Sequence, residues 1–203
     1  MLEHAVCALA RLPAIQCVFV VLAPGDAYFG HCSWGELDRK VLPLYCGGPT
    51  RAASVFNGLM ALHDQVEDAD WILVHDAARP CLSVLESERL LAELAQDDVG
   101  GLLALPVADT IKRADGNGRV AATEPREGLW RALTPQMFRY RLLVHAMHAA
   151  DLSAVTDESS AIERIGLRPR LVAGSATNIK VTYADDLALA ATILHERGES
   201  GCE

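Results

Sequence analysis

The sequence predicts an α/β fold with a mostly parallel sheet and an inserted β-hairpin arm, and three observations support this class. Short apolar runs typical of strands alternate with helical patterns, and there is no internal repeat. The run from Gly101 to Val107 is apolar on both faces, as expected of a buried strand in a parallel sheet. Asp115-Gly116-Asn117-Gly118 is a strong turn signal between two short extended runs, 110–113 and 119–123.

Local sequence features predict the helices and strands before residue 76. The first helix carries Leu2, Val6 and Leu9 on one face and stops at Pro13, which cannot continue a helix. Gly47-Gly48-Pro49 then separates the second strand from the second helix. The expected elements are a helix over 2–12, strands over 17–23 and 41–46 joined by an irregular polar stretch at 24–40, a helix over 51–63, and a strand over 71–75.

The second half of the chain contains clear helix starts. Ser83 and Glu86 are spaced as a capping box, which predicts a helix running to about residue 96. Thr156 and Thr182 are expected to cap two later helices. The other expected elements are a helix over about 139–150 and short strands over 171–173 and 179–181. We expect one domain over residues 1–203, with the β-arm at about 108–129.

Composition narrows the class of protein. The chain has 203 residues, of which 51% are hydrophobic and 22% charged, as in a folded domain. Its net charge of −9 argues against a general nucleic-acid binder, although a nucleotide could still bind a local basic site. No apolar run is long enough to cross a bilayer. The six cysteines form no CxxC pair, which favours a reduced, cytoplasmic setting.

The segment VHDAARP at residues 74–80 is the most informative stretch for chemistry. It follows a short apolar strand, and ligands of open α/β sheets bind beyond the carboxyl ends of strands. Arg79 could hold a phosphate, and Asp76 could accept a hydrogen bond from a sugar hydroxyl or help place a metal ion. A strand end with a solvated Asp–Arg pair is an equally simple interpretation. His145 and His148 could share a metal, but no third ligand is near in sequence, so no metal site is predicted.

Several other segments carry polar residues at element ends. Taken singly, each is explained by a turn, a helix cap or a solvated lysine. Taken together and in this order, they resemble the 2-C-methyl-D-erythritol 4-phosphate cytidylyltransferases of the non-mevalonate isoprenoid pathway, from residue 2 to about residue 194. The segments are GGPTRAASV (47–55), VHDAARP (74–80), PVADTIKR (106–113), GLWRALTPQMF (128–138), TDESSA (156–161) and NIKVTYADDL (178–187).

That resemblance implies a fold, a reaction and an assembly. The family has a Rossmann-like sheet of the nucleotidyltransferase type, with a β-arm that clasps a second subunit in a homodimer. It joins CTP to methylerythritol phosphate with Mg²⁺ and releases pyrophosphate. The substrate phosphate attacks the α-phosphorus of CTP without a covalent enzyme intermediate, so catalysis rests on positioning and on cations near developing charge.

The resemblance also implies roles for residues on the nucleotide side. Gly48 and Ser54 would contact the cytosine. Asp76 and Ala77 would meet the ribose region and the second substrate. Lys180 would stabilise the transition state at the α-phosphate, which makes it the central catalytic candidate.

On the side of the second substrate, the resemblance implies a site shared between subunits. Arg79 would lie beside the methylerythritol phosphate pocket. Thr110 and Arg126 would reach from the partner's β-arm and grip the substrate phosphate, and Thr134 and Thr156 would give supporting contacts.

The sequence departs from the family pattern in one large respect. The family begins with a strand and a glycine-rich loop of the type AAGxGxR, followed by PKQ, and neither pattern occurs in these 203 residues. We therefore expect an N-terminally truncated fold, lacking about 30 residues, with weak or no activity. Two alternatives stay open: a ribitol 5-phosphate cytidylyltransferase, or a catalytically silent nucleotide-binding paralogue. A smaller departure is Pro49, where the family usually has an acidic residue.

Overall fold

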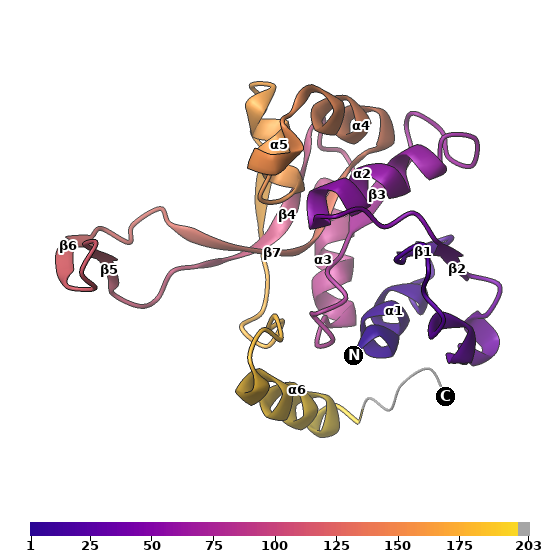
Figure 1. Ribbon diagram of the computed structural model, residues 1–203, viewed down its shortest axis with the longest axis horizontal. Coiled ribbons are helices and arrows are strands. Elements are labelled where there is room, and N and C mark those ends of the chain that lie inside the picture. Colours follow the sequence, from indigo (N-terminus) through magenta and orange to yellow (C-terminus); the bar gives the residue numbers. More distant parts are fainter. Residues whose placement is uncertain (199–203) are drawn as a thin grey trace.

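A computed structural model describes residues 1–198 and shows a four-stranded sheet between two groups of helices (Figure 1). The β4 and β8 strands pair in parallel, whereas β7 runs antiparallel to both β3 and β4. Three strands therefore share one direction and a single reversed strand lies among them, so the expected α/β class is confirmed. The order β3-β7-β4-β8 is formed by Trp71–Val74, Trp130–Arg139, Gly100–Pro106 and Arg170–Ala173.

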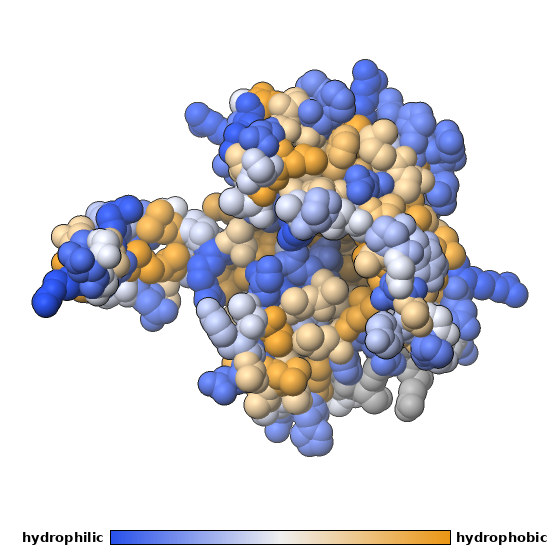
Figure 2. Space-filling view, viewed as in Figure 1, coloured by the Kyte–Doolittle hydropathy of each residue, from blue (hydrophilic) through white to orange (hydrophobic). Residues whose placement is uncertain are grey.

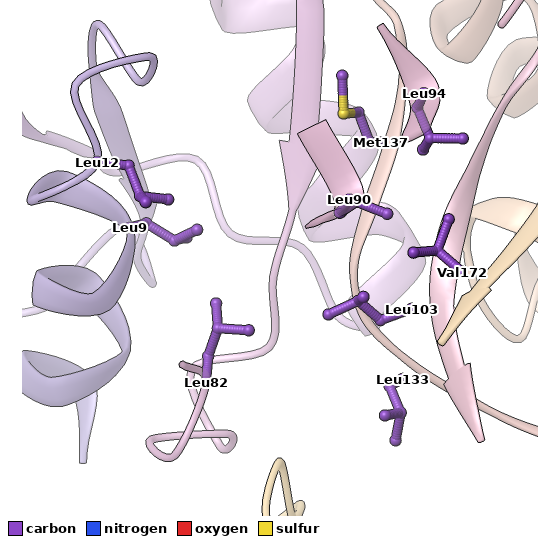
Figure 3. Close-up of a cluster of buried hydrophobic side chains, with 9 residues drawn as sticks. All are labelled: Leu9, Leu12, Leu82, Leu90, Leu94, Leu103, Leu133, Met137 and Val172. Carbon is purple, nitrogen blue, oxygen red and sulfur yellow. The ribbon is translucent and has the colours of Figure 1, made fainter. Parts of the chain in front are cut away.

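Neighbouring side chains of β7 point to opposite faces of the sheet and so enter two separate cores. Met137 packs with Leu90 and Leu94 of α3 (Val84–Leu94) and with Leu103 of β4 (Figure 3). Phe138 packs on the other face against the three helices α2 (Arg51–Ala61), α4 (Tyr140–Ala149) and α5 (Glu158–Arg164). Each fully buried side chain of this size contributes roughly 1.5–3 kcal/mol, so the two cores fix the sheet between its helices.

A second, smaller sheet lies beside the first. It consists of β1 (Val18–Val21) paired in parallel with β2 (Val41–Leu44), and it packs against α1 (Leu2–Ala10). The connection between its strands is mostly irregular, as expected, with the short 3₁₀ turns η1 (Phe29–His31) and η2 (Gly35–Leu37). Within residues 1–198, β1 pairs only with β2, and β3 pairs only with β7. The unpaired sides of β1 and β3 line the same cavity of about 730 Å³.

The β-arm is the hairpin that the turn signal predicts. Strands β5 (Ile111–Ala114) and β6 (Val120–Glu124) pair antiparallel and project away from the body (Figure 1). Asp115 Oδ1 accepts hydrogen bonds from the main-chain N–H groups of Asn117 and Arg119, each at 2.9 Å. Gly118 has a φ of 76°, a left-handed conformation that glycine adopts without strain.

Helix caps confirm one prediction and correct two. Ser83 and Glu86 form the predicted capping box at the start of α3. The cap of α5 is Asp157 rather than Thr156, because the Asp157 carboxylate accepts from the Ser160 N–H. The cap of α6 (Ala184–Glu196) is Tyr183 rather than Thr182, and the Asp186 carboxylate accepts from the N–H groups of both.

Two strand predictions also need correction. The sequence did not predict β7, which is a ten-residue central strand. Conversely, residues 179–181 form no strand; their link to the sheet region is a hydrogen bond from the Val181 N–H to the Ala78 carbonyl at 2.8 Å. A short 3₁₀ turn, η3 (Leu152–Ala154), lies between α4 and α5.

The lengths of the helices and the state of the cysteines bear on the predictions about membrane spans and disulfides. Within residues 1–198, every helix is too short or too polar to cross a membrane. Cys17, Cys32 and Cys46 carry free thiols, whereas Cys7 is disulfide-bonded, which is not what the sequence predicted. Cys202 lies outside the described residues.

Candidate active site

A cluster of charged side chains surrounds Asp76, the second residue after the end of β3. Its Oδ1 lies 2.7 Å from Arg51 Nε, and its Oδ2 lies 3.1 Å from Lys180 Nζ and 3.8 Å from Arg79 Nε. Burial raises the pKa of Asp76, but the charges and hydrogen bonds of Arg51 and then Lys180 outweigh burial and hold this pKa below its ordinary value. The carboxylate is therefore charged and fixed between three cations.

Arg51 extends this cluster to a second carboxylate. It is the first residue of α2, directly after the N-cap Thr50. Its Nη1 and Nη2 donate to the two oxygens of Glu158 at 2.7 and 3.0 Å, and the Glu158 side chain is fully buried at the start of α5. Burial raises the pKa of Glu158, while the Arg51 charge opposes that rise. A single guanidinium thus joins two helix starts to the end of β3.

A neutral hydrogen-bond network lies behind Asp76. Thr134 Oγ1 accepts from the Asp76 N–H at 3.1 Å, which leaves its hydroxyl hydrogen to bond His75 Nδ1 at 2.9 Å. His75 Nε2 lies 3.1 Å from the Arg79 carbonyl, so this nitrogen must carry the hydrogen. Burial is the largest influence on His75 and lowers its pKa to about 4, which keeps the ring uncharged near neutral pH.

Arg79 and Asn178 close the same network. Arg79 Nη1 donates to the Asn178 carbonyl at 2.8 Å, and Asn178 Nδ2 donates to the Thr134 carbonyl at 2.9 Å. Arg79 Nε and Asn178 Oδ1 are buried and have no hydrogen-bond partner among the described residues. Both polar atoms therefore keep unused hydrogen-bonding capacity, and Arg79 Nε keeps it 3.8 Å from Asp76 Oδ2.

Gly48 and Ser54 lie together where β2 passes into α2. The Gly48 N–H donates to Ser54 Oγ at 3.0 Å, and Ser54 Oγ donates to the Thr50 carbonyl at 2.9 Å. A Cβ added at Gly48 would lie 2.7 Å from Ala53 Cβ, so only glycine fits without movement of the chain. Glycine at residue 48 thus has a steric cause, and the two residues expected to contact the cytosine lie side by side.

Part of this cluster lines the cavity of about 730 Å³ between the two sheets. Arg51, Ser54, His75, Asp76 and Lys180 give it polar groups, while Ala77 and the strands and helices around it supply apolar walls. Figure 2 shows this face of the molecule hollowed at its centre, where hydrophilic residues meet apolar ones. The site therefore offers positive charge beside an enclosed space large enough for a small ligand.

The other predicted site residues lie elsewhere. Thr110 and Arg126 are exposed on the β-arm, where Arg126 donates to the Ala108 carbonyl. Thr156 is exposed and lines a second cavity of about 360 Å³, beside Gly128 and Trp130 at the base of the arm. Within one copy of the chain, these three residues are absent from the lining of the larger cavity, so their predicted roles stay predictions.

Sequence reasoning missed three residues of the site, namely Arg51, Glu158 and His75. All three fall inside segments that the sequence analysis singled out, next to residues that were assigned roles. Their position in the elements was the available signal: Arg51 and Glu158 are each the first residue of a helix, and His75 directly follows a strand. The long-range pairing between residues 51 and 158 leaves no local trace in the sequence.

Comparison with known proteins identifies relatives over nearly the whole chain. The family model described as "IspD: 2-C-methyl-D-erythritol 4-phosphate cytidylyltransferase" matches residues 1–196. The protein of that name from Azoarcus sp. is 57% identical over 197 residues, covering 97% of this chain and 83% of the relative. Its counterpart from Dechloromonas aromatica is 57% identical over 194 residues, covering 96% and 84%.

Solved structures similar to this chain come from the same family. The crystal structure of a 4-diphosphocytidyl-2C-methyl-D-erythritol synthase superposes with a TM-score of 0.85 at 39% identity, over 95% of this chain and 89% of the other. The 2-C-methyl-D-erythritol 4-phosphate cytidylyltransferase from Thermus thermophilus gives a TM-score of 0.78 at 32% identity, over 96% and 89%.

Proposed function

Because the chain belongs to the 2-C-methyl-D-erythritol 4-phosphate cytidylyltransferase family, we propose that it transfers the cytidylyl group of CTP to 2-C-methyl-D-erythritol 4-phosphate and releases pyrophosphate. The observation that carries the proposal is the cluster of Asp76, Lys180 and Arg79 at the end of β3, on the edge of the 730 Å³ cavity. This cluster supplies cations where a phosphate transfer needs them.

The reaction needs positioning rather than a covalent intermediate. An oxygen of the substrate phosphate forms a bond to the α-phosphorus of CTP, and the bond from that phosphorus to the bridging oxygen breaks as pyrophosphate leaves. Negative charge grows on the α-phosphate oxygens during this exchange. Lys180 is the cation best placed to stabilise it, since its side chain is 47% exposed and its Nζ is held by Asp76 at 3.1 Å.

The remaining residues then have distinct places around the two substrates. Gly48 and Ser54 would meet the cytosine: Ser54 lines the cavity, and the Gly48 N–H is bonded to its hydroxyl at 3.0 Å. Ala77 would allow the ribose to approach the backbone. Arg79, with an unused buried Nε, would lie beside the phosphate of the polyol.

Magnesium would reach this site with the nucleotide. Mg²⁺ usually binds one or two carboxylates together with substrate phosphates. Within residues 1–198 there is no group of three or more metal-ligating side chains, and Asp76 already faces three cations. The described residues therefore do not fit a protein-held site, and Mg²⁺ would instead be bound by the phosphates of CTP.

The β-arm would complete the site in a homodimer. The arm projects from the body (Figure 1). Among its charged residues it exposes apolar side chains, with Val120 66% and Leu129 44% exposed. Exposed apolar side chains on a projecting arm favour contact with another molecule. Two arms exchanged across a two-fold axis could place Thr110 and Arg126 of one copy near the substrate phosphate of the other.

The test is pyrophosphate release from CTP and 2-C-methyl-D-erythritol 4-phosphate, with CTP binding measured separately by calorimetry. In a form of the protein extended to include the glycine-rich loop, Lys180→Ala should lower kcat by about 10²–10³ and change CTP binding less, because the contact strengthens in the transition state. Lys180→Arg should restore little activity, since a planar fork does not replace a compact ammonium. Arg141→Ala, which removes a cation 78% exposed on α4, is the matched control.

Two outcomes would count against this proposal. An unchanged kcat in Lys180→Ala would return Lys180 to a solvated lysine. CTP binding without turnover that persists after the family's glycine-rich loop is added before residue 1 would favour the catalytically silent nucleotide-binding protein instead.

A further inference from the structure

Arg51 is held more rigidly than a surface cation, because each of its three side-chain nitrogens bonds a carboxylate. Nε donates to Asp76 at 2.7 Å, and the two terminal nitrogens donate to Glu158 at 2.7 and 3.0 Å. Two parallel bonds to one carboxylate fix the plane of the guanidinium. The direction of Nε, and hence the place of the Asp76 carboxylate, is set by the Arg51–Glu158 pair.

The position of Asp76 in turn sets that of Lys180. Arg51 occupies Oδ1 of Asp76, which leaves Oδ2 to face Lys180 Nζ at 3.1 Å. Lys180 lies in a segment outside the helices and strands, so the backbone alone constrains it weakly. Its side chain is also half-exposed and long enough to adopt other rotamers. The ion pair with Asp76 is therefore the main constraint on where the ammonium points.

We propose that Arg51 is a positioning residue of the transfer reaction: clamped by the buried Glu158, it fixes Asp76, which aims the Lys180 ammonium at the reacting phosphate. This inference rests on the proposed function for its consequence in catalysis. Three successive contacts carry the effect: Glu158 to Arg51, Arg51 to Asp76, and Asp76 to Lys180. They join the starts of α2 and α5 to the end of β3. Errors of about 1 Å in such a chain typically cost on the order of 10²-fold in rate.

The test must remove the clamp without leaving a buried charge. Arg51→Ala alone would strand the fully buried Glu158 and could unfold the protein. The double variant Arg51→Met with Glu158→Met replaces the pair as a unit by side chains of similar length, a change that folded proteins often tolerate. Arg51→Lys is a second variant, because one ammonium cannot make both a fork to Glu158 and a bond to Asp76.

The first measurement needs no activity. Titration of carboxyl carbons by NMR should show that the pKa of Asp76 rises in the double variant, since Arg51 is the cation that lowers it most. Asp151 is the matched control: hydrogen bonds from Ser153 lower its pKa, and Arg51 is not among the groups that influence it. An unchanged Asp76 pKa in a folded double variant would overturn the inference.

The second measurement separates positioning from ligand contact. We expect kcat to fall by about 10- to 100-fold in the double variant and in Arg51→Lys, with CTP binding nearly unchanged. Weakened CTP binding with an unchanged kcat would instead make Arg51 a ligand contact and refute the positioning role. If the chain shows no cytidylyl transfer even with the glycine-rich loop added before residue 1, the proposed function fails, while the titration still decides whether Arg51 fixes Asp76.

Discussion

Stability should depend on pH through His75, a buried uncharged imidazole behind the site. Burial lowers the pKa of this ring from 6.5 to about 4 in the folded protein. The unfolded chain therefore binds a proton between these two values while the folded protein does not, so protons favour unfolding as the pH falls. The stabilisation is fully present above about pH 6.5 and is lost progressively down to pH 4.

The magnitude follows from the two pKa values. A tenfold difference in proton affinity corresponds to about 1.4 kcal/mol, so a fall from 6.5 to about 4 amounts to a loss of about 3 kcal/mol at pH 4. That loss is large against a total stability of about 5–15 kcal/mol for a typical domain. The effect should therefore be measurable without extreme conditions.

The assay compares urea unfolding of the parent chain and of His75→Gln between pH 7 and pH 4. Gln cannot titrate, yet it can offer a donor to the Arg79 carbonyl that His75 Nε2 approaches at 3.1 Å. The difference in unfolding free energy between the two proteins should fall by about 3 kcal/mol over this range. Carboxylates common to both proteins cancel in the difference.

His63→Gln, at an exposed position, serves as the control and should leave the pH dependence unchanged. A parent-minus-variant difference that stays constant from pH 7 to pH 4 would show that His75 is not a buried neutral ring. The tautomer inferred from Thr134 and Arg79 would then be wrong as well.

Two further predictions concern a helix cap and the β-arm. Asp157→Ala should lower the unfolding free energy by about 1 kcal/mol, and Thr156→Ala should change it little, because Asp157 is the residue that caps α5; equal effects in urea unfolding would contradict this assignment. Val120→Glu on the arm should shift a dimer toward monomer in light scattering, because a charge would enter an apolar contact at a side chain now 66% exposed. A parent chain that is monomeric at every accessible concentration would argue against the arm exchange and the roles of Thr110 and Arg126 in the partner's site.

Much of the fold could be predicted because its signals are local. The capping box at Ser83 and Glu86 depends on two residues three apart, and the hairpin turn depends on Asp115 and Gly118. Two cap predictions were wrong by one residue; in α5, Thr156 and Asp157 are both good capping residues and only geometry separates them.

The β7 strand escaped prediction because Thr134-Pro135 lies inside it, and proline is normally excluded from central strands. The structure accommodates Pro135 at an irregularity: the pairing with β4 shifts register between Leu102 and Ala104, opposite residues 133–135. Pairing with β3 ends at Gln136. Pro135 therefore sits where no ladder hydrogen bond is required of it.

In the site, too, residues within recognisable motifs could be predicted, whereas contacts between distant segments could not. Asp76, Arg79 and Lys180 were predicted as a group, and the structure places them together. The link from Arg51 to Glu158 spans 107 positions and depends on how α2 and α5 pack, so no sequence spacing reveals it.

The unpaired sides of β1 and β3 affect how the isolated chain behaves at high concentration. Each presents a row of N–H and C=O groups in an apolar stretch, VFVV and WILV, next to a cavity that leaves room for a neighbour. Such edges are templates for intermolecular strand pairing. Aggregation of this protein should therefore start at β1 and β3 rather than at the charged hairpin, and it should grow with concentration even while the rest of the fold stays native.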